Sequence, residues 1–370
     1  MGFRRIDALD YNAIINGAYD FNQRNNGGSS SLSARQYVCQ DRWAINRPSS
    51  VATAGSINAT PQTDLPPGQS MGKSCRLVCN TIATTTTFHT YDQRIEGIWA
   101  QPLIGKKCVY QFWAKSNVDR NLNLSFIQNG SNSRRIGSDF VTESGLVWKK
   151  YQYAVDFGAS GILDPIVDIN NAVEVRFELG QIGQTTGSVN DQWVDGSTGP
   201  FFVAGKDTFM DDPTNELHFW GHVMRPVTDE QFNTVANGGE IDMDFSRAGG
   251  DYPGELMLCQ RYFEKSYRIG QPVGAAGDFQ GAARVRATGA VNSTTLFFPM
   301  AFNTPKRSTL PLILIYNPSS GALGAYNDST AANVSSGAST RSNFQWTWRT
   351  NVTVTVNSLY SFHWTSDAEL

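Results

Sequence analysis

The residues best suited to chemistry lie in a long polar stretch between residues 180 and 215. Protein sites for sugars combine an aromatic ring face, which covers sugar C–H groups, with amide and carboxylate groups that bind hydroxyls. This stretch offers that mixture, and we predict a glycan site there. The alternative is a loop whose aromatic side chains only pack on the chain or on another subunit. The predicted sugar-binding residues are Trp193, Asp191, Asp195 and Asn190, with Trp220 farther along the chain.

Acidic side chains near the end of the same stretch could bind a cation. Ca²⁺ prefers hard oxygen ligands, and the candidate ligands are Asp207, Asp211, Asp212 and Glu216. Their spacing lacks the register of an EF-hand, so solvated acids on a loop are the alternative. His218 and His222 would share one face of a strand. No Glu-x-x-His context accompanies them, and no metal is predicted there.

An enzyme that cleaves glycans would need two carboxylates flanking the sugar bond, and the stretch contains enough acids for that. The sequence has no Gly-x-Ser-x-Gly, no P-loop and no dinucleotide fingerprint. It also has no repeat of fixed period, which would indicate a β-helix. We therefore expect no enzymatic activity, and glycan cleavage is the less favoured alternative.

Composition excludes other classes of function. The 370 residues carry a net charge of −3, and no basic block exceeds two residues, so we expect no nucleic-acid partner. The sequence has no apolar run long enough to insert into a membrane. The five cysteines are scattered and no signal peptide precedes them, which predicts reduced, buried thiols in a protein made in a cytoplasm.

Short strands dominate the rest of the chain. Alternating apolar and polar residues, separated by Gly, Asn and Ser turns, predict a β-sandwich. The predicted strands span 108–116, 122–128, 148–155, 172–179, 218–224, 284–288, 295–301, 312–316, 344–347 and 352–356. The predicted helices span 7–16, 228–236 and 254–267, and Thr228 begins the second as a capped first turn. Trp113 lies within the first strand and is predicted to pack in the core.

Turn-forming residues between 249 and 254 predict a linker between two domains. We divide the chain into a first segment of residues 1–35, a sandwich domain of residues 36–248 with an insert at 180–215, and a C-terminal β domain of residues 255–370. In the C-terminal domain, residues 310–315 are apolar at nearly every position. Such a strand is expected to be buried on both faces, within its domain or against another chain.

A series of short motifs occurs in a particular order along nearly the whole chain. They are Asn16-Gly17-Ala18-Tyr19 with Gln23-Arg24, Tyr37 before Asp41-Arg42-Trp43, Gln93-Arg94-Ile95-Glu96, Leu103-Ile104-Gly105-Lys106 with Phe112-Trp113-Ala114-Lys115-Ser116, Leu256 to Lys265, and Ser366 to Leu370. The series resembles tailed-bacteriophage fibre, spike and head-decoration proteins that carry a jelly-roll domain of carbohydrate-binding-module type. Met224-Arg225-Pro226 departs from the Gln-Leu-Glu that usually closes this jelly roll.

The resemblance implies an all-β chain, with a jelly-roll β-sandwich followed by a second, smaller β domain. It implies a protein of the virion surface, made in the host cytoplasm, that assembles as a homotrimer and contacts other virion proteins. We expect it to bind host surface polysaccharide for attachment; the alternative is a head decoration, cement or adaptor protein with structural contacts alone. Residues 1–15 are the expected docking segment. Arg42 and Arg94 are either ligand contacts or structural charges above a packed Trp43.

Overall fold

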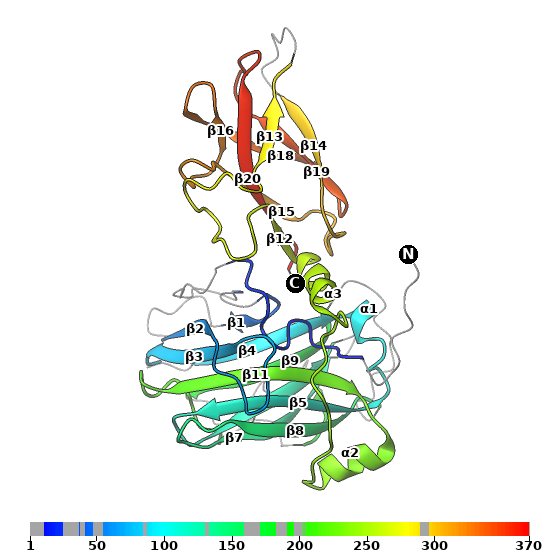
Figure 1. Cartoon of the computed structure of the whole chain (residues 1–370). Helices are drawn as coiled ribbons and strands as arrows, with labels where there is room; N and C mark the ends of the chain where they lie inside the picture. Colours follow the sequence, from blue (N-terminus) through cyan, green and yellow to red (C-terminus); the bar gives the residue numbers. More distant parts are fainter. Residues whose placement is uncertain are drawn as a thin grey trace. The chain divides into compact units, whose positions relative to one another are not determined.

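The computed structural model describes residues 11–24, 37, 41–46, 55–83, 87–129, 133–158, 171–182, 191–195, 203, 205–288 and 296–369. These residues are almost entirely β structure (Figure 1). The chain forms two compact units. The first comprises residues 1–20 and 27–255 with residue 370, and the second comprises residues 21–26 and 256–369. Residues 21–26 thus join the second unit although they lie near the start of the sequence.

The first unit contains two antiparallel sheets (Figure 1). One has the order β1 (Ala44–Asn46), β4 (Thr87–Glu96), β9 (Asn171–Ile182), β6 (Arg120–Gln128), β7 (Arg134–Thr142) and β10 (Val194–Asp195). The other has the order β2 (Ser56–Gln62), β3 (Ser74–Thr81), β11 (Glu216–Pro226), β5 (Lys107–Ser116) and β8 (Lys149–Asp156). From β4 onward the chain passes repeatedly from one sheet to the other, as in a jelly roll. The predicted jelly-roll sandwich is confirmed.

Side chains from both sheets fill the space between them. In β5, Tyr110, Phe112 and Ala114 are buried in this core. Because side chains alternate along a strand, Trp113 lies on the outer face, where it is partly exposed and pairs with Trp220 and Lys150. The prediction that Trp113 packs in the core is therefore wrong. The cysteines Cys75, Cys79, Cys108 and Cys259 are buried and form no disulfide with one another.

A β-bulge separates the two histidines of β11. The pairing of β11 with β5 shifts register between Trp220 and Val223, and Gly221 has a φ of 70°. The extra residue turns His222 into the core, whereas His218 lies on the outer face beside Glu216. His222 forms hydrogen bonds with the hydroxyls of Tyr19 and Tyr110, at 2.6 and 2.5 Å. The expectation that both histidines share one face is wrong.

The motif residues near the start of the chain are structural. Arg42 and Trp43 are buried, and the Arg42 guanidinium donates to the carbonyl of Arg94. The side chain of Gln93 accepts from the backbone N–H of Ile15 at 2.9 Å and donates to its carbonyl at 2.8 Å. Arg94 forms an ion pair with Glu174 across the β4–β9 ladder, at 3.2 Å. These contacts support the structural interpretation of both arginines.

The helices are short. α1 spans Gly97–Ala100, and α2 spans Asp229–Ala236, where Thr228 and Gln231 form the capping box that the sequence predicts. α3 spans Tyr252–Gln260 and begins inside the predicted linker, because Glu255 accepts the N–H of Gly249 and stabilises the turn before it. Residues 11–16 of the first predicted helix are not helical, and residues 7–10 lie outside the described part of the chain. None of the helices within the described residues has the length and apolar character that crossing a membrane requires.

The second unit is a smaller all-β domain built around β20 (Leu359–Asp367) (Figure 1). β20 pairs with β12 (Phe263–Lys265), β13 (Ala283–Arg286), β15 (Leu312–Tyr316) and β16 (Ala325–Asn327), and β17 (Ala332–Val334) extends the sheet. A second sheet has the order β14 (Phe297–Ala301), β19 (Gln345–Thr350) and β18 (Ser336–Arg341). Trp346, Trp348 and Phe362 pack in the core. The strand predicted at 352–356 is wrong, because these residues pair with no neighbouring strand.

Candidate functional site

The candidate site lies where the two sheets of the first unit meet at one edge. β8 is the last strand of its sheet, and β7 lies next to the short β10 at the edge of the other. Two tyrosines of β8 join these edges: the hydroxyls of Tyr151 and Tyr153 donate to the carbonyls of Val141 and Asp139, both at 2.9 Å. Burial raises the pKa of both tyrosine hydroxyls.

A groove of about 500 Å³ opens at this edge. Its walls come from β7, β8, the segment that enters β10, and α2, which packs on β8 and β5. Aromatic rings and polar groups both contribute to the surface, as in sites that bind small polar ligands. The lining residues are Ile136, Ser138, Asp139, Gln152, Tyr153, Ala154, Asp156, Asp191, Trp193, Phe232, Val235 and Ala236.

Trp193 is held in place by contacts of both its side chain and its backbone. Its indole N–H donates to the carbonyl of Asp156 at 3.0 Å, and its own carbonyl accepts from the guanidinium of Arg134 at 3.2 Å. Its ring packs against Phe157, with centroids 5.9 Å apart. The side chain remains partly exposed at the groove. One part of the indole therefore anchors the segment while another is available to a ligand.

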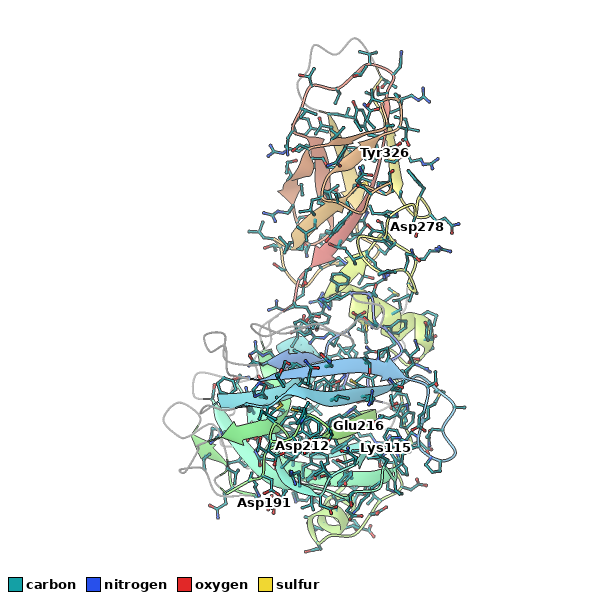
Figure 2. The ribbon with its side chains drawn as sticks, turned by 90° about the vertical axis from the view of Figure 1, so that its left-hand side faces the viewer. Lys115, Asp191, Asp212, Glu216, Asp278 and Tyr326 are labelled. Carbon is teal, nitrogen blue, oxygen red and sulfur yellow. The ribbon has the colours of Figure 1, made fainter. Side chains whose placement is uncertain are left out.

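Asp191 lies at the start of the β10 segment, at the edge of the sandwich (Figure 2). Its φ of 57° places the backbone in the left-handed region, and its N–H donates to the carbonyl of Gly137 at 2.7 Å. Its carboxylate accepts a hydrogen bond from the hydroxyl of Ser138 at 2.6 Å. On β7, Asp139 forms an ion pair with Lys206, and burial lowers the pKa of that lysine. The carboxylates of the groove are thus fixed by neighbouring donors.

The structure brings together some of the predicted sugar-binding residues and not others. Trp193 and Asp191 share the groove. Asn190 and the side chain of Asp195 lie outside the described residues, although the backbone of Asp195 pairs with Arg134. The prediction of Trp220 as a contact is wrong, because its side chain is 1% exposed.

Trp220 points away from the sandwich core, but other segments cover it. Its indole N–H donates to the carbonyl of Met71 at 3.1 Å, and its ring packs on Phe245 with centroids 5.3 Å apart. Phe245 belongs to a segment that crosses the outer face of this sheet, where Met243 accepts from the side chain of Gln111 at 2.7 Å. No ring face of Trp220 is left for stacking on a sugar.

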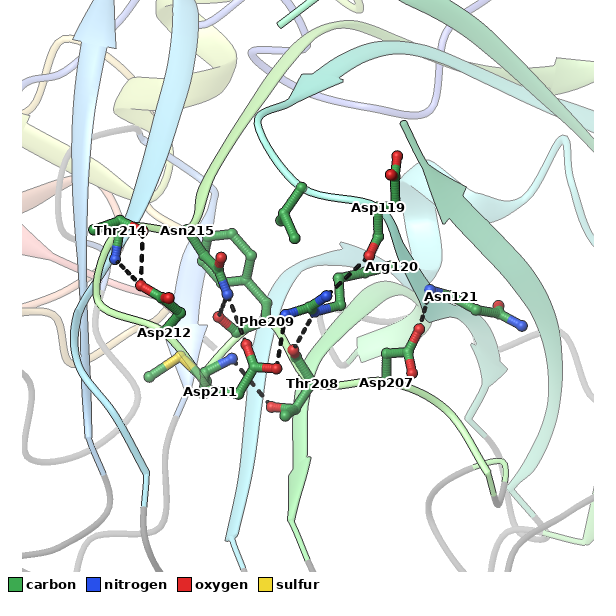
Figure 3. A network of polar contacts seen from close by, with 12 residues as sticks. Asp119, Arg120, Asn121, Asp207, Thr208, Phe209, Asp211, Asp212, Thr214 and Asn215 are labelled. Atoms are coloured by element: carbon green, nitrogen blue, oxygen red, sulfur yellow. Dashed lines mark hydrogen bonds and ion pairs between the residues drawn. The ribbon is translucent and has the colours of Figure 1, made fainter. Parts of the chain in front are cut away.

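The predicted calcium ligands do not converge (Figure 3). Asp207 accepts from the backbone N–H of Asn121, Asp211 pairs with the guanidinium of Arg120, and Asp212 accepts from the backbone and hydroxyl of Thr214, each at 2.7 Å. Among the residues that the structure describes, no group of His, Cys, Asp and Glu could hold a metal ion. The predicted calcium set is therefore not assembled, because each aspartate caps a different turn or neighbour.

Glu216, the fourth acid of that set, belongs to a different cluster on the outer face of β11. Its carboxylate pairs with Arg76 at 2.7 Å and with the imidazole of His218 at 2.5 Å. The hydrogen bond from Arg76 is the main reason why the pKa of Glu216 falls to about 2. Glu216 thus serves as an anion between two strands and is not available as a metal ligand.

Several residues of the groove were not predicted from the sequence. β7 was not predicted as a strand, so Ser138 and Asp139 were missed. Tyr153 lies in the strand predicted at 148–155 and Asp156 directly follows it, but their part in a site follows only from the meeting of β7 and β8 at one edge. Phe232 comes from the predicted helix α2, whose amphipathic pattern gives no sign of a ligand.

No family model and no curated protein matches the chain. Among solved structures, it is similar to the enzymatically active domain of tailspike protein 4 of bacteriophage CBA120, with 13% identity and a TM-score of 0.32, over 58% of this chain and 21% of that one. A family 4 carbohydrate-binding module gives 15% identity and 0.31, over 57% and 98%. A family 11 module from a Clostridium thermocellum cellulase gives 11% and 0.29, over 54% and 96%. The jelly-roll β-sandwich fold of the first unit rests on its own strand order.

Proposed function

We propose that the chain is a non-enzymatic virion surface protein of a tailed bacteriophage that binds host surface glycans in the groove between β7, β8, β10 and α2. The observation that carries the glycan part is the pairing of a partly exposed Trp193 with polar side chains that β7 and β8 bring to the same groove. A sugar ring can cover the free part of the indole while its hydroxyls bind the carboxylates.

The virion part of the proposal rests on the ordered motifs in the sequence. They support assembly in a host cytoplasm, a place on the particle surface, and contacts with other virion proteins. The structural alternative, a head decoration or adaptor, predicts that Trp193 is covered by its own chain or by a neighbour. In the single chain, Trp193 packs partly against the core and is partly exposed at the groove, and this exposed part supports the glycan proposal.

Replacing Trp193 with alanine tests the glycan part. Removing the indole face should weaken binding about 10- to 100-fold, because burial of a large apolar side chain contributes about 1.5–3 kcal/mol. A glycan array identifies bound sugars, titration calorimetry gives the affinity, and a reducing-end assay is expected to detect no cleavage. Trp148→Ala is the matched control, since Trp148 is partly exposed and is not among the groove residues. An array without any bound glycan, or equal loss in both variants, would refute the proposal.

The second unit supports the homotrimer that the motifs imply. On β15, Ile313 and Ile315 point into the core, whereas Leu312 and Leu314 point outward and are 56% and 36% exposed. Groups of exposed apolar side chains are characteristic of surfaces that contact another protein. Other exposed apolar residues of this unit are Phe297, Leu310, Leu323 and Phe344. Trimer formation would bury the outward face of β15, which a single copy leaves exposed.

The double variant Leu312→Asp/Leu314→Asp should convert a trimer into monomers at micromolar concentration, because each interface would have to bury unpaired carboxylates. Light scattering coupled to size exclusion measures the mass, and circular dichroism checks that the chain is folded. Val147→Asp, at a 72% exposed position of the first unit, is the control. A monomeric wild type, or a trimer that survives the double substitution, would exclude this role of β15.

A further inference from the structure

A second groove, of about 380 Å³, lies on the outer face of the sheet that contains β5 and β11. Side chains of β5, β8 and β11 contribute to its lining, among them Trp113 and Lys150. The rest of the lining comes from two segments outside the sheet, at residues 69–71 between β2 and β3 and at residues 242–245 after α2. Among the described residues, it shares no lining residue with the groove at β7, β8, β10 and α2. The two grooves are therefore separate sites of the first unit.

Both segments that border this second groove are held against the sheet. The carbonyl of Met71 accepts from the indole N–H of Trp220 at 3.1 Å. The carbonyl of Met243 accepts from the side chain of Gln111 at 2.7 Å, and the ring of Phe245 packs on that of Trp220. The groove is thus formed within the chain itself. A preformed groove costs a ligand less, because few protein groups must be ordered on binding.

Trp113 supplies an accessible aromatic surface in this groove. Its side chain is partly exposed, whereas Trp220, its cross-strand neighbour, is 1% exposed. The residue after Trp220 is Gly221, whose φ of 70° belongs to the β-bulge. A Cβ at residue 221 would lie 3.5 Å from the Cδ1 atom of Trp113, so glycine leaves this edge of the indole without a covering side chain. An accessible ring in a groove suits the C–H face of a sugar.

The polar groups of the second groove include both donors and acceptors. Lys150 pairs with Glu240 at 2.7 Å, and because an ammonium has three N–H groups, this pair does not use all of them. Asp242 and Asp244 are exposed acceptors, and the carboxamide of Gln69 both donates and accepts. A hydroxyl can use either kind of group. An anion or a cation would instead meet a like charge in this groove, so an uncharged ligand rich in hydroxyls fits it best.

We propose that the second groove is a further saccharide site, which binds a neutral sugar with one ring stacked on Trp113. The sugar hydroxyls would accept from Lys150 and donate to the carboxylates of Asp242 and Asp244. This inference goes beyond the site at Trp193 and does not depend on it, because the two grooves have different linings.

Titration calorimetry of the full chain with neutral oligosaccharides tests this proposal. The probes are cellotetraose, mannotetraose and maltotetraose, and the Trp193→Ala variant serves as the background, so that binding at the first groove is weakened. We expect at least one probe to bind, and we expect Trp113→Ala to weaken that binding about tenfold, because the apolar contact with the indole is lost. Trp113→Phe keeps an aromatic ring and should bind within about threefold of the background.

Asp244→Ala tests the polar side of the same groove at an exposed position, where the fold does not depend on the side chain. We expect about three- to tenfold weaker binding from the loss of one hydrogen bond to a charged group. Trp148→Ala is the matched control, since Trp148 is partly exposed and lines neither groove, and it should leave binding unchanged. Circular dichroism checks that each variant is folded.

The two saccharide sites can fail independently. Binding of the probes that is lost in Trp193→Ala and insensitive to Trp113→Ala would overturn the second site and support the first. Binding that depends on Trp113 and is equal with and without Trp193 would support the second site and count against the first. If none of the three probes bound, or if Trp148→Ala weakened binding as much as Trp113→Ala, the second site would be excluded.

Discussion

Replacing Lys306 with methionine is expected to destabilise the second unit by about 3–5 kcal/mol, as is typical when one partner of a buried ion pair is removed. The side chains of Lys306 and Glu264 are fully buried and form an ion pair. Glu264 also accepts from the backbone N–H and the side chain of Asn303, at 3.0 and 2.7 Å, and Lys306 donates to the carbonyl of Gln260. Without the ammonium, the carboxylate of Glu264 would be buried without its cation.

Denaturant unfolding of the full chain measures this loss. Lys150→Met is the matched control, because the ion pair of Lys150 with Glu240 is solvent-accessible, and we expect a cost below about 1 kcal/mol. The double variant Lys306→Met/Glu264→Leu should regain most of the stability, since both charges leave the core together. If Lys306→Met matched Lys150→Met, or if the double variant were no better than Lys306→Met, the buried pair would not have the role assigned to it.

This ion pair illustrates what the sequence can and cannot predict. Glu264 lies in the motif Leu256 to Lys265, and the motif indicates a family resemblance without saying what the glutamate does. Its partner Lys306 is 42 residues away, in a loop with no recognisable pattern. The residue type in a sequence does not show whether a charged side chain is buried or exposed. Only the packing of β12 against that loop distinguishes them.

Strand prediction found the strands whose apolar and polar residues alternate most clearly, and it missed others, among them β4 and β7. β5, β6, β8, β9 and β11 alternate clearly and were predicted. β4 was missed, and the charge of its Arg94 is satisfied across the sheet by Glu174 of the neighbouring strand β9. In sequence, such residues look like those of a loop. Cross-strand pairing makes them compatible with a strand, and pairing is not visible in a single sequence.

Only part of the candidate site was predicted, because the pairing of strands that brings the other residues there is not visible in a single sequence. Trp193 and Asp191 are neighbours in sequence, so their combination was visible. Tyr153 and Asp139 join them only because the tyrosine hydroxyl connects β8 to β7. Trp220 was a sugar-binding candidate by its residue type, and the segment containing Phe245 covers it. The period of a strand tells which side a residue faces, and does not tell what lies on that side.

The second large prediction concerns Phe112 and Trp113, consecutive residues of β5 of which the first faces the core and the second the outer face. We expect Phe112→Ala to cost about 3–5 kcal/mol, because a large buried ring leaves a cavity that the core cannot close. The Phe112 side chain is 0% exposed, and its ring packs against those of Phe177 and Phe140, with centroids 5.0 and 5.4 Å away. Trp113→Ala, at the next position, should cost much less, about 1 kcal/mol, because its ring lies partly exposed on the outer face.

Urea unfolding of the two variants, with Phe112→Leu as a conservative control, decides whether Phe112 or Trp113 faces the core. Each alanine variant removes one of two neighbouring aromatic rings of the same strand, so the change in strand propensity is similar in both. The two variants differ mainly in the face of the sheet from which the ring is removed. A larger loss for Trp113→Ala than for Phe112→Ala would mean that the strand faces the other way. The register of β5 against β8 and β11 would then be shifted by one residue, and every residue of β5 would exchange faces.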